Sequence, residues 1–184
     1  MNKCVIIAWG SLIWDPRDLS YSGTWRKGGP QLPIEYSRIA MDGRLTLVID
    51  DDDGALCSTW TADAVLQLGD AIANLARRER CPIRHIGYTP RPSGTSGNDA
   101  SFVQSATIER WRTDHNYDSV IWTALPRTFE QCSGRPFSVD AAIDYLDTLK
   151  GETRERAFEY IRRAPATTAT PVRSAFLARW PDGK

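Results

Sequence analysis

The chain has 184 residues, of which 41% are hydrophobic and 25% are charged. This length suits one domain that buries about two-thirds of its unfolded surface, so residues 1–184 are predicted to form a single domain. The 23 basic and 23 acidic residues give no net charge. That balance argues against nucleic acid or an anionic membrane as the partner and leaves a small molecule as the expected ligand.

Cysteine and histidine usage limits the chemistry further. The cysteines lie far apart with no Cys-x-x-Cys pair, which favours reduced thiols and a cytoplasmic location: Cys4, Cys57, Cys81 and Cys132. The N-terminal apolar run is too short for a signal peptide, and no stretch approaches the roughly 20 apolar residues of a membrane span. Because His85 and His115 supply few soft ligands, we expect no metal.

The first predicted strand leads into a tight loop. Residues 4–8 form a continuous apolar run, which is typical of a strand covered on both faces. The chain must then turn at Gly10. Backbone N–H groups exposed at such a turn suit a small polar or anionic group.

The next segments predict a small meander. Residues 15–33 are rich in glycine and proline and are expected to be irregular. Residues 33–40 and 44–50 predict two strands of a hairpin that turns at Asp42-Gly43. Residues 50–54 predict a solvated turn rather than a calcium loop, because no glutamate follows at the twelfth position. A third strand is predicted over residues 55–60.

Residues 61–80 predict a helix that begins at Thr61. Its apolar stripe, Val65, Leu68, Ile72 and Leu75, continues to Glu79, which directs that carboxylate toward the interior. Burial and the negative end of the helix both disfavour the charged form, so Glu79 suits proton transfer near neutral pH. The alternative is that the helix frays and Glu79 pairs with a neighbouring arginine at the surface.

The second half of the chain predicts fewer site residues. A strand over 83–88 is followed by a Pro/Gly/Ser-rich loop, 89–99, that is either a lid or a plain connection. A helix over 105–112 precedes a strand over 119–124, in which Trp122 suits the core and Thr123 could line a pocket. Helices that begin at Ser138 and Glu152 predict a hairpin, and the tail from 165 has no assigned structure. Its Arg173 or Arg179 could meet a substrate carboxylate.

Two motifs resemble a known superfamily. The loop Trp9-Gly10-Ser11-Leu12-Ile13-Trp14 resembles the glycine-serine loop of the gamma-glutamylcyclotransferases, most closely the ChaC-like and AIG2-like branch. The segment from Leu75 to Glu79, with a strand after it, resembles the part that carries the catalytic glutamate in that superfamily. The motifs lie about 70 residues apart in the superfamily's order, and the resemblance covers residues 5–90.

The resemblance implies an α+β fold built on a small mixed β-barrel, with the 138–184 hairpin and tail laid on it. It implies an intramolecular aminoacyl transfer that releases 5-oxoproline from a gamma-glutamyl compound, as in glutathione metabolism, without metal or cofactor. Glu79 would be the general acid and base, and Trp9, Gly10, Ser11 and Leu12 would bind the substrate.

Two other functions stay open. The superfamily commonly has tyrosine where this chain has Trp9, so a non-catalytic module that binds a small ligand or a protein on the same fold is the second hypothesis. Nucleophilic catalysis by Ser11 or a cysteine is the third, although both histidines are distant from Ser11 and neither follows a recognisable hydrolase pattern.

Overall fold

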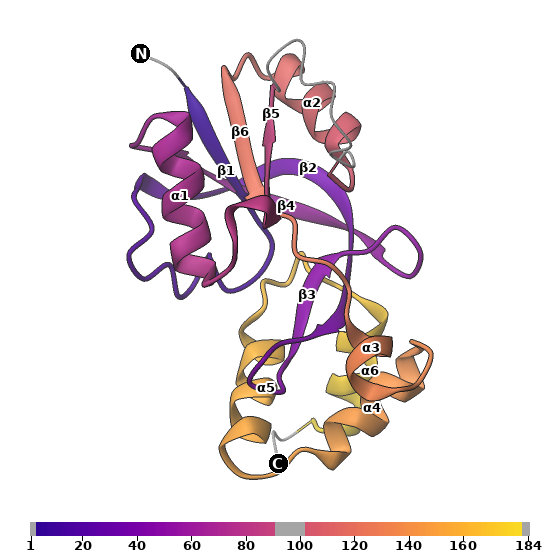
Figure 1. The fold of residues 1–184 in the computed structure, drawn as a ribbon. Coiled ribbons are helices and arrows are strands. Elements are labelled where there is room, and N and C mark those ends of the chain that lie inside the picture. The colour runs from indigo at the N-terminus through magenta and orange to yellow at the C-terminus, as the bar shows by residue number, and fades with distance from the viewer. Residues whose placement is uncertain (1–2, 91–101, 182–184) are drawn as a thin grey trace.

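A computed structural model describes residues 3–90 and 102–181 of the chain, and in these residues one mixed sheet is combined with six α-helices (Figure 1). The strands are β1 (Cys4–Ala8), β2 (Tyr21–Ile39), β3 (Leu45–Ile49), β4 (Ala55–Ala64), β5 (Ile86–Thr89) and β6 (Ser119–Thr123). The helices are α1 (Leu68–Glu79), α2 (Ser105–Asp114), α3 (Phe129–Ser133), α4 (Val139–Thr148), α5 (Gly151–Arg163) and α6 (Pro171–Arg179), with a 3₁₀ turn at Ile83–His85.

The sheet is open rather than closed. Its strand order is β3-β2-β4-β1-β6-β5, in which only the β1 and β6 pair is parallel. Within the described residues no ladder joins the edge strands β3 and β5. The predicted mixed α+β class is therefore confirmed, and the predicted closure into a barrel is not.

Strand β1 is buried on both faces, as its apolar run predicts. Cys4, Ile6 and Ala8 pack in one core with Leu75 of α1. Val5 and Ile7 face a second core, which includes Ile108 of α2. Side chains alternate across a strand, so a continuous apolar run lets β1 contribute to two layers at once.

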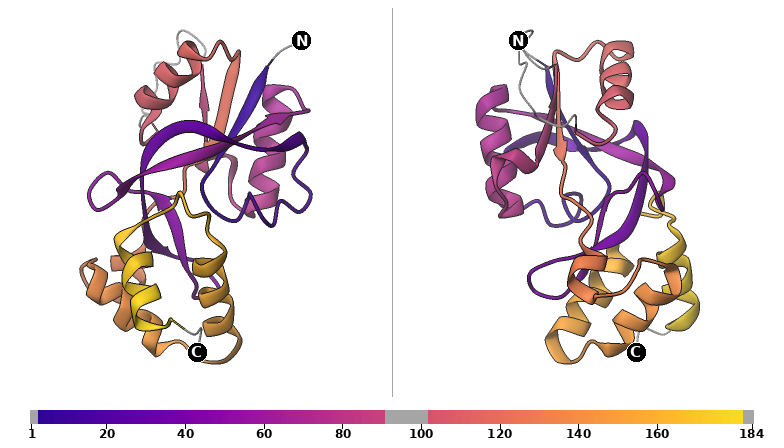
Figure 2. Two further views of the ribbon diagram at one scale, coloured as in Figure 1. Left: turned by 180° about the vertical axis from the view of Figure 1, so that it is seen from behind. Right: turned by 45° about the vertical axis from the view of Figure 1, so that its right-hand side comes forward.

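The prediction of irregular structure over 15–33 is wrong, because β2 begins at Tyr21. Register shifts interrupt its pairing with β4 between Ser22 and Arg26 and again between Lys27 and Gln31. Gly23 and Gly28 have positive φ and lie within these shifts. The two glycines therefore lie at β-bulges, which bend one long strand without ending it. The bend carries β2 from β4 across to β3 (Figures 1 and 2).

The predicted start of the first helix is also wrong. Thr61 pairs with Ile7 as part of β4, and α1 begins at Leu68 after Gln67. The hairpin prediction is confirmed, since Ile34 pairs with Ile49 and Ile39 with Leu45. Sheet pairing outweighs the local helical pattern over 61–64, because β4 hydrogen-bonds on both sides there.

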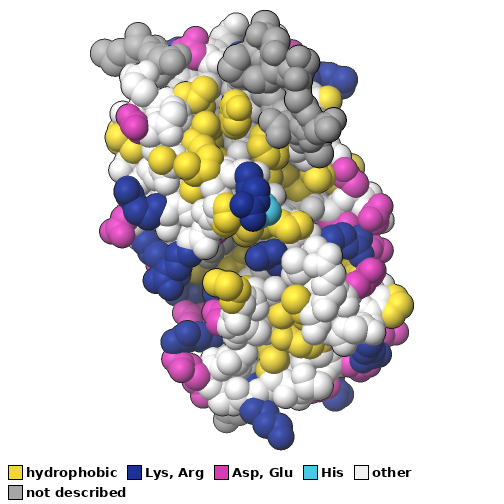
Figure 3. All heavy atoms as spheres, viewed as in Figure 1, with side chains coloured by type: hydrophobic (Ala, Val, Ile, Leu, Met, Phe, Trp, Pro, Cys, Tyr) yellow, Lys and Arg dark blue, Asp and Glu magenta, His cyan; other side chains and the backbone are white. Residues whose placement is uncertain are grey.

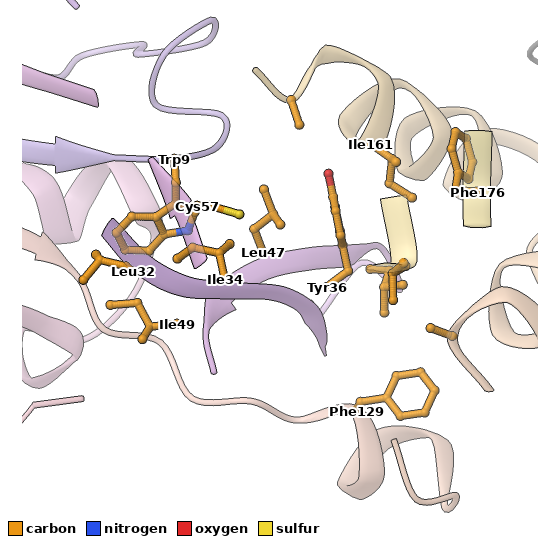
Figure 4. Packing of buried hydrophobic residues seen from close by; sticks show 14 of the residues in the cluster. Trp9, Leu32, Ile34, Tyr36, Leu47, Ile49, Cys57, Phe129, Ile161 and Phe176 are labelled. Carbon is orange, nitrogen blue, oxygen red and sulfur yellow. The ribbon is translucent and has the colours of Figure 1, made fainter. Parts of the chain in front are cut away.

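The helices after β6 gather at the far end of the sheet, around β3 and the end of β2 (Figures 1 and 2). Ser138 caps α4 through the N–H of Ala141, as predicted, and α5 follows. In the unassigned tail, Thr170 and Pro171 start α6, a cap signal that the sequence carries. Ile161 and Phe176 pack with Tyr36 of β2 in one core (Figure 4). Among the described residues, no helix is both long and apolar enough to cross a membrane.

Candidate functional site

A cavity of about 780 Å³ lies among the loop after β1, the end of α1, the β2–β3 hairpin and α5. This volume is within the usual range for small-molecule sites. Figure 3 shows Lys and Arg side chains on both sides of the hollow between the upper and lower parts of the molecule. Both sequence motifs, 9–12 and the region of Glu79, reach this cavity.

The loop after β1 is a turn with unused donors. The carbonyl of Gly10 accepts from the N–H of Ile13, and that of Ser11 accepts from Asp15. Within the described part of the chain, the N–H groups of Gly10, Ser11 and Leu12 have no acceptor. These three residues line the cavity, so their amides are available to a ligand.

Two residues of this loop anchor it by their side chains. Trp9 is only 5% exposed, and its indole packs among Leu32 and Ile34 (Figure 4). Its carbonyl accepts a hydrogen bond from Thr168 at 2.8 Å. Leu12 packs in the core beneath α1. Both line the cavity, and their largely buried side chains fix the loop in place.

Glu79 ends α1, where Arg80 terminates the helix in the left-handed conformation. The prediction that Glu79 turns inward fits its 16% exposed side chain. Its neighbour Arg78 lies off the apolar stripe in the helical spacing but is buried as well, with a side chain that is 3% exposed. Because the helix end lies against the β1 loop, its interior face is wider than the apolar stripe.

Arg78 joins the two motifs. Its Nη1 donates to Oε1 of Glu79 at 2.8 Å, and its Nη2 donates to Oγ of Ser11 at 3.2 Å and to the carbonyl of Asp15. Thr123 approaches the same oxygen, with its Oγ1 3.5 Å from Oε1. A single guanidinium thus spans the gap between the carboxylate and the loop.

Tyr160 of α5 is a site residue that the sequence analysis missed. Its hydroxyl accepts from the N–H of Leu47 at 3.5 Å, and Arg44 lies over its ring at 5.6 Å. A Cβ on Gly10 would be 3.1 Å from the Tyr160 hydroxyl. Gly10 has a φ outside the left-handed region, so this close approach, and not the turn, is what favours a glycine.

The charges of the site affect its titratable neighbours. Burial, with the charge of Glu79, raises the pKa of the Cys81 thiol to about 11 and that of Tyr160 to about 12. Burial and two arginines lower the pKa of His85. Cys81 is therefore protonated at neutral pH, which makes it a poor nucleophile.

The remaining candidates are placed as follows. Thr123 lines the cavity, and Trp122 is fully buried in the core, as its size predicts. Arg173 donates to carbonyls of the segment between α5 and α6, and Arg179 pairs with Asp147 at the surface, so neither reaches the cavity. Most of the 89–99 loop lies outside the described residues. No group of acidic, cysteine or histidine residues in 3–90 and 102–181 could hold a metal ion.

The chain matches no model of a known protein family, and no curated protein sequence matches it.

Proposed function

We propose that the protein is a gamma-glutamylcyclotransferase-like enzyme, which releases 5-oxoproline and an amine or amino acid from a gamma-glutamyl compound. The observation that carries this proposal is the Arg78 bridge, which holds the Glu79 carboxylate and the Ser11 hydroxyl on one guanidinium. A carboxylate within reach of unused loop amides is the arrangement that proton transfer beside a polarised carbonyl requires.

In the proposed reaction, the gamma-glutamyl end binds to the amides of Gly10, Ser11 and Leu12. Glu79 takes a proton from the substrate ammonium, and the freed α-amino nitrogen attacks the γ-carbonyl carbon. The new C–N bond closes the five-membered ring, the old amide C–N bond breaks, and Glu79 returns the proton to the departing amine. The two reacting groups belong to one molecule, so positioning lowers much of the barrier.

Side chains around Glu79 suit this role. Arg78 stabilises the carboxylate and orients it toward the cavity, and the Tyr160 hydroxyl, whose high pKa keeps it protonated, is a hydrogen-bond donor facing the same space. The third hypothesis, nucleophilic catalysis, is not favoured, because Ser11 accepts its hydrogen bond from Arg78 and that guanidinium cannot act as a base.

The decisive experiment is Glu79→Gln. We expect 5-oxoproline release from gamma-glutamyl amino acids to fall by about 100-fold or more, since the amide cannot carry the proton. The melting temperature should fall by only a few degrees, because the amide oxygen still accepts from Arg78 while the ion pair is lost.

Glu155→Gln, the same change at an exposed position on α5, is the matched control and should retain full release. An active Glu79→Gln protein would overturn the mechanism. If wild-type protein releases no 5-oxoproline from any gamma-glutamyl amino acid, amine or peptide, the chain is a binding module on the same scaffold.

A further inference from the structure

Two arginines at the cavity lack the carboxylate partner that the others have within the described residues. Five other arginines at the cavity each pair with a carboxylate: Arg17 with Asp15, Arg44 with Asp42, Arg78 with Glu79, Arg156 with Glu152 and Arg163 with Glu159. Among the described residues, Arg38 and the exposed Arg80 have no such partner. Arg38 differs from Arg80 in being partly buried. A partly buried guanidinium without a counter-ion is costly unless it serves a ligand.

The surroundings of Arg38 hold it in place without a direct ion pair among the described residues. Its Nη1 donates to the carbonyl of Pro126 at 3.0 Å, which uses one donor and leaves the other N–H groups of the fork available. Burial lowers the pKa of Arg38, and the charge of Glu79 opposes this shift only in part. A guanidinium fixed in this way matches a planar carboxylate.

The position of Arg38 separates it from the glycine-serine loop. Glu79 contacts Arg78, which leads to Ser11, and its other neighbour is Thr123, at the end of β6. The chain continues from Thr123 to Pro126, whose carbonyl holds Arg38. Arg38 is therefore attached, through Pro126, to the segment that follows Thr123, a contact of Glu79.

We infer that Arg38 binds the carboxylate of the leaving half of the substrate, so that the protein acts on gamma-glutamyl amino acids or peptides in preference to gamma-glutamyl amines. This inference rests on the proposed function, because Glu79 marks where the amide bond breaks. With the glutamyl end on the loop amides, the leaving half extends past Glu79 toward Arg38. The cavity, at about 780 Å³, has room for both halves of a dipeptide.

The test compares gamma-glutamyl-alanine with gamma-glutamyl-ethylamine, which differ only in that carboxylate. We expect wild-type kcat/KM for 5-oxoproline release to favour the alanine compound by about 10- to 100-fold, the usual effect of a charge-assisted hydrogen bond. Arg38→Gln should reduce this ratio to near 1. Arg38→Lys, which keeps the charge but not the fork, should restore part of it.

The matched control is Arg26→Gln, on the same strand β2, whose arginine pairs with Asp63 outside the cavity. It should leave the ratio unchanged. Melting temperatures of all variants confirm that they fold, and the lysine variant keeps the test valid if the glutamine variant does not.

Calorimetric titration of both compounds separates this inference from the proposed function. If both compounds are converted with equal kcat/KM by the wild-type protein, or if Arg38→Gln keeps the preference, the inference is wrong and the cyclotransferase stands. If no 5-oxoproline forms but only the alanine compound binds, and binding needs Arg38, the carboxylate site stands without the enzyme. If neither compound binds nor reacts, both are wrong.

Discussion

Gly10 and Tyr160 show how single residues define the cavity. The glycine lies on the loop after β1 and the tyrosine on α5, and a methyl group at position 10 would lie 3.1 Å from the hydroxyl. This contact brings the glycine-serine loop against the wall that α5 supplies, and neither residue reveals it in the sequence.

The contact predicts the effect of Gly10→Ala. We expect a loss of about 1 kcal/mol in the free energy of unfolding, because the methyl group must displace the Tyr160 hydroxyl. Adding Tyr160→Phe should recover most of it, since the next atom of the ring lies 4.0 Å away. Urea unfolding of the four proteins in a double-mutant cycle measures this coupling. Purely additive losses would contradict the proposed contact.

The inward position of Glu79 was predicted from the sequence, but its partners were not. Helical spacing is enough to place one side chain on an interior stripe. It does not show that Arg78 is buried as well, that Thr123 of β6 approaches the carboxylate, or that Tyr160 and Arg38 face the same cavity. These residues are brought together from four elements, and contacts between distant elements leave no periodic signal.

Among the elements, the β5 and β6 pair depends on a glycine. Gly87 pairs with Trp122, and a Cβ on it would lie 2.1 Å from the indole. Gly87→Ala should therefore destabilise the protein by about 2–4 kcal/mol, because Trp122 is fully buried and cannot move aside.

Gly69 is the matched control for that substitution. It lies in the first turn of α1, where an added Cβ would have no atom within 4 Å. Gly69→Ala should leave stability unchanged or raise it by up to about 1 kcal/mol, through helix propensity. Thermal and urea unfolding measure both variants, and a similar effect at the two positions would contradict the packing argument.

The junction of β2 and α6 is held by a buried carboxyl group and predicts a pH effect. Glu35 accepts from the N–H groups of Tyr36 at 2.7 Å and Val172 at 3.3 Å, the second residue of α6. Burial raises the pKa of Glu35, against hydrogen bonds that lower it. The folded state therefore holds this proton more tightly than the unfolded state does.

The unfolded chain loses the Glu35 proton first, at a pH of about 4.5, while the folded protein keeps it to a higher pH. The free energy of unfolding therefore falls as the pH rises from about 4.5 through the folded-state pKa of Glu35. Glu35→Gln cannot ionise, so its free energy of unfolding should fall less than that of the wild-type protein over this range. Urea unfolding at pH 4 to 8 checks this, with Glu155→Gln as a surface control. A constant difference between wild-type and Glu35→Gln proteins would refute it.

Local sequence patterns predict helices and strands well where the strand pairing of the sheet agrees with them. The hairpin of β2 and β3, helix α2 and the capped helix α4 all follow their signals. The errors fall where the sheet overrides local chemistry. Gly23 and Gly28 form bulges in β2 instead of turns, and Thr61 pairs with β1 instead of capping a helix.

For the molecule as a whole, the sheet and the C-terminal helices share one core. Tyr36 of β2 packs with Ile161 and Phe176, and Thr168 donates to the carbonyl of Trp9 in the loop after β1. The wall of the cavity that α5 supplies is therefore coupled to the sheet that supplies the other walls.

This shared core predicts one cooperative unfolding transition. Trp122 lies on β6 and Trp180 lies with the C-terminal helices, and both belong to the same cluster. Urea unfolding of the Trp122→Phe and Trp180→Phe proteins can be followed by tryptophan fluorescence and by far-UV circular dichroism. Within each variant, both signals should give the same single midpoint. Two separate transitions would show that the helical part folds independently, against the predicted single domain.

The amino-acid sequence by itself determined the mixed α+β class, the doubly buried first strand, the loop at Gly10 and the inward Glu79, because each depends on residues close together in the chain. Only the tertiary structure decided that the sheet stays open, that Arg78 links the loop to the carboxylate, and that Tyr160 and Arg38 complete the cavity. Those features depend on which strands pair and which helices pack across them, and such choices minimise the free energy of the whole chain rather than of any one segment.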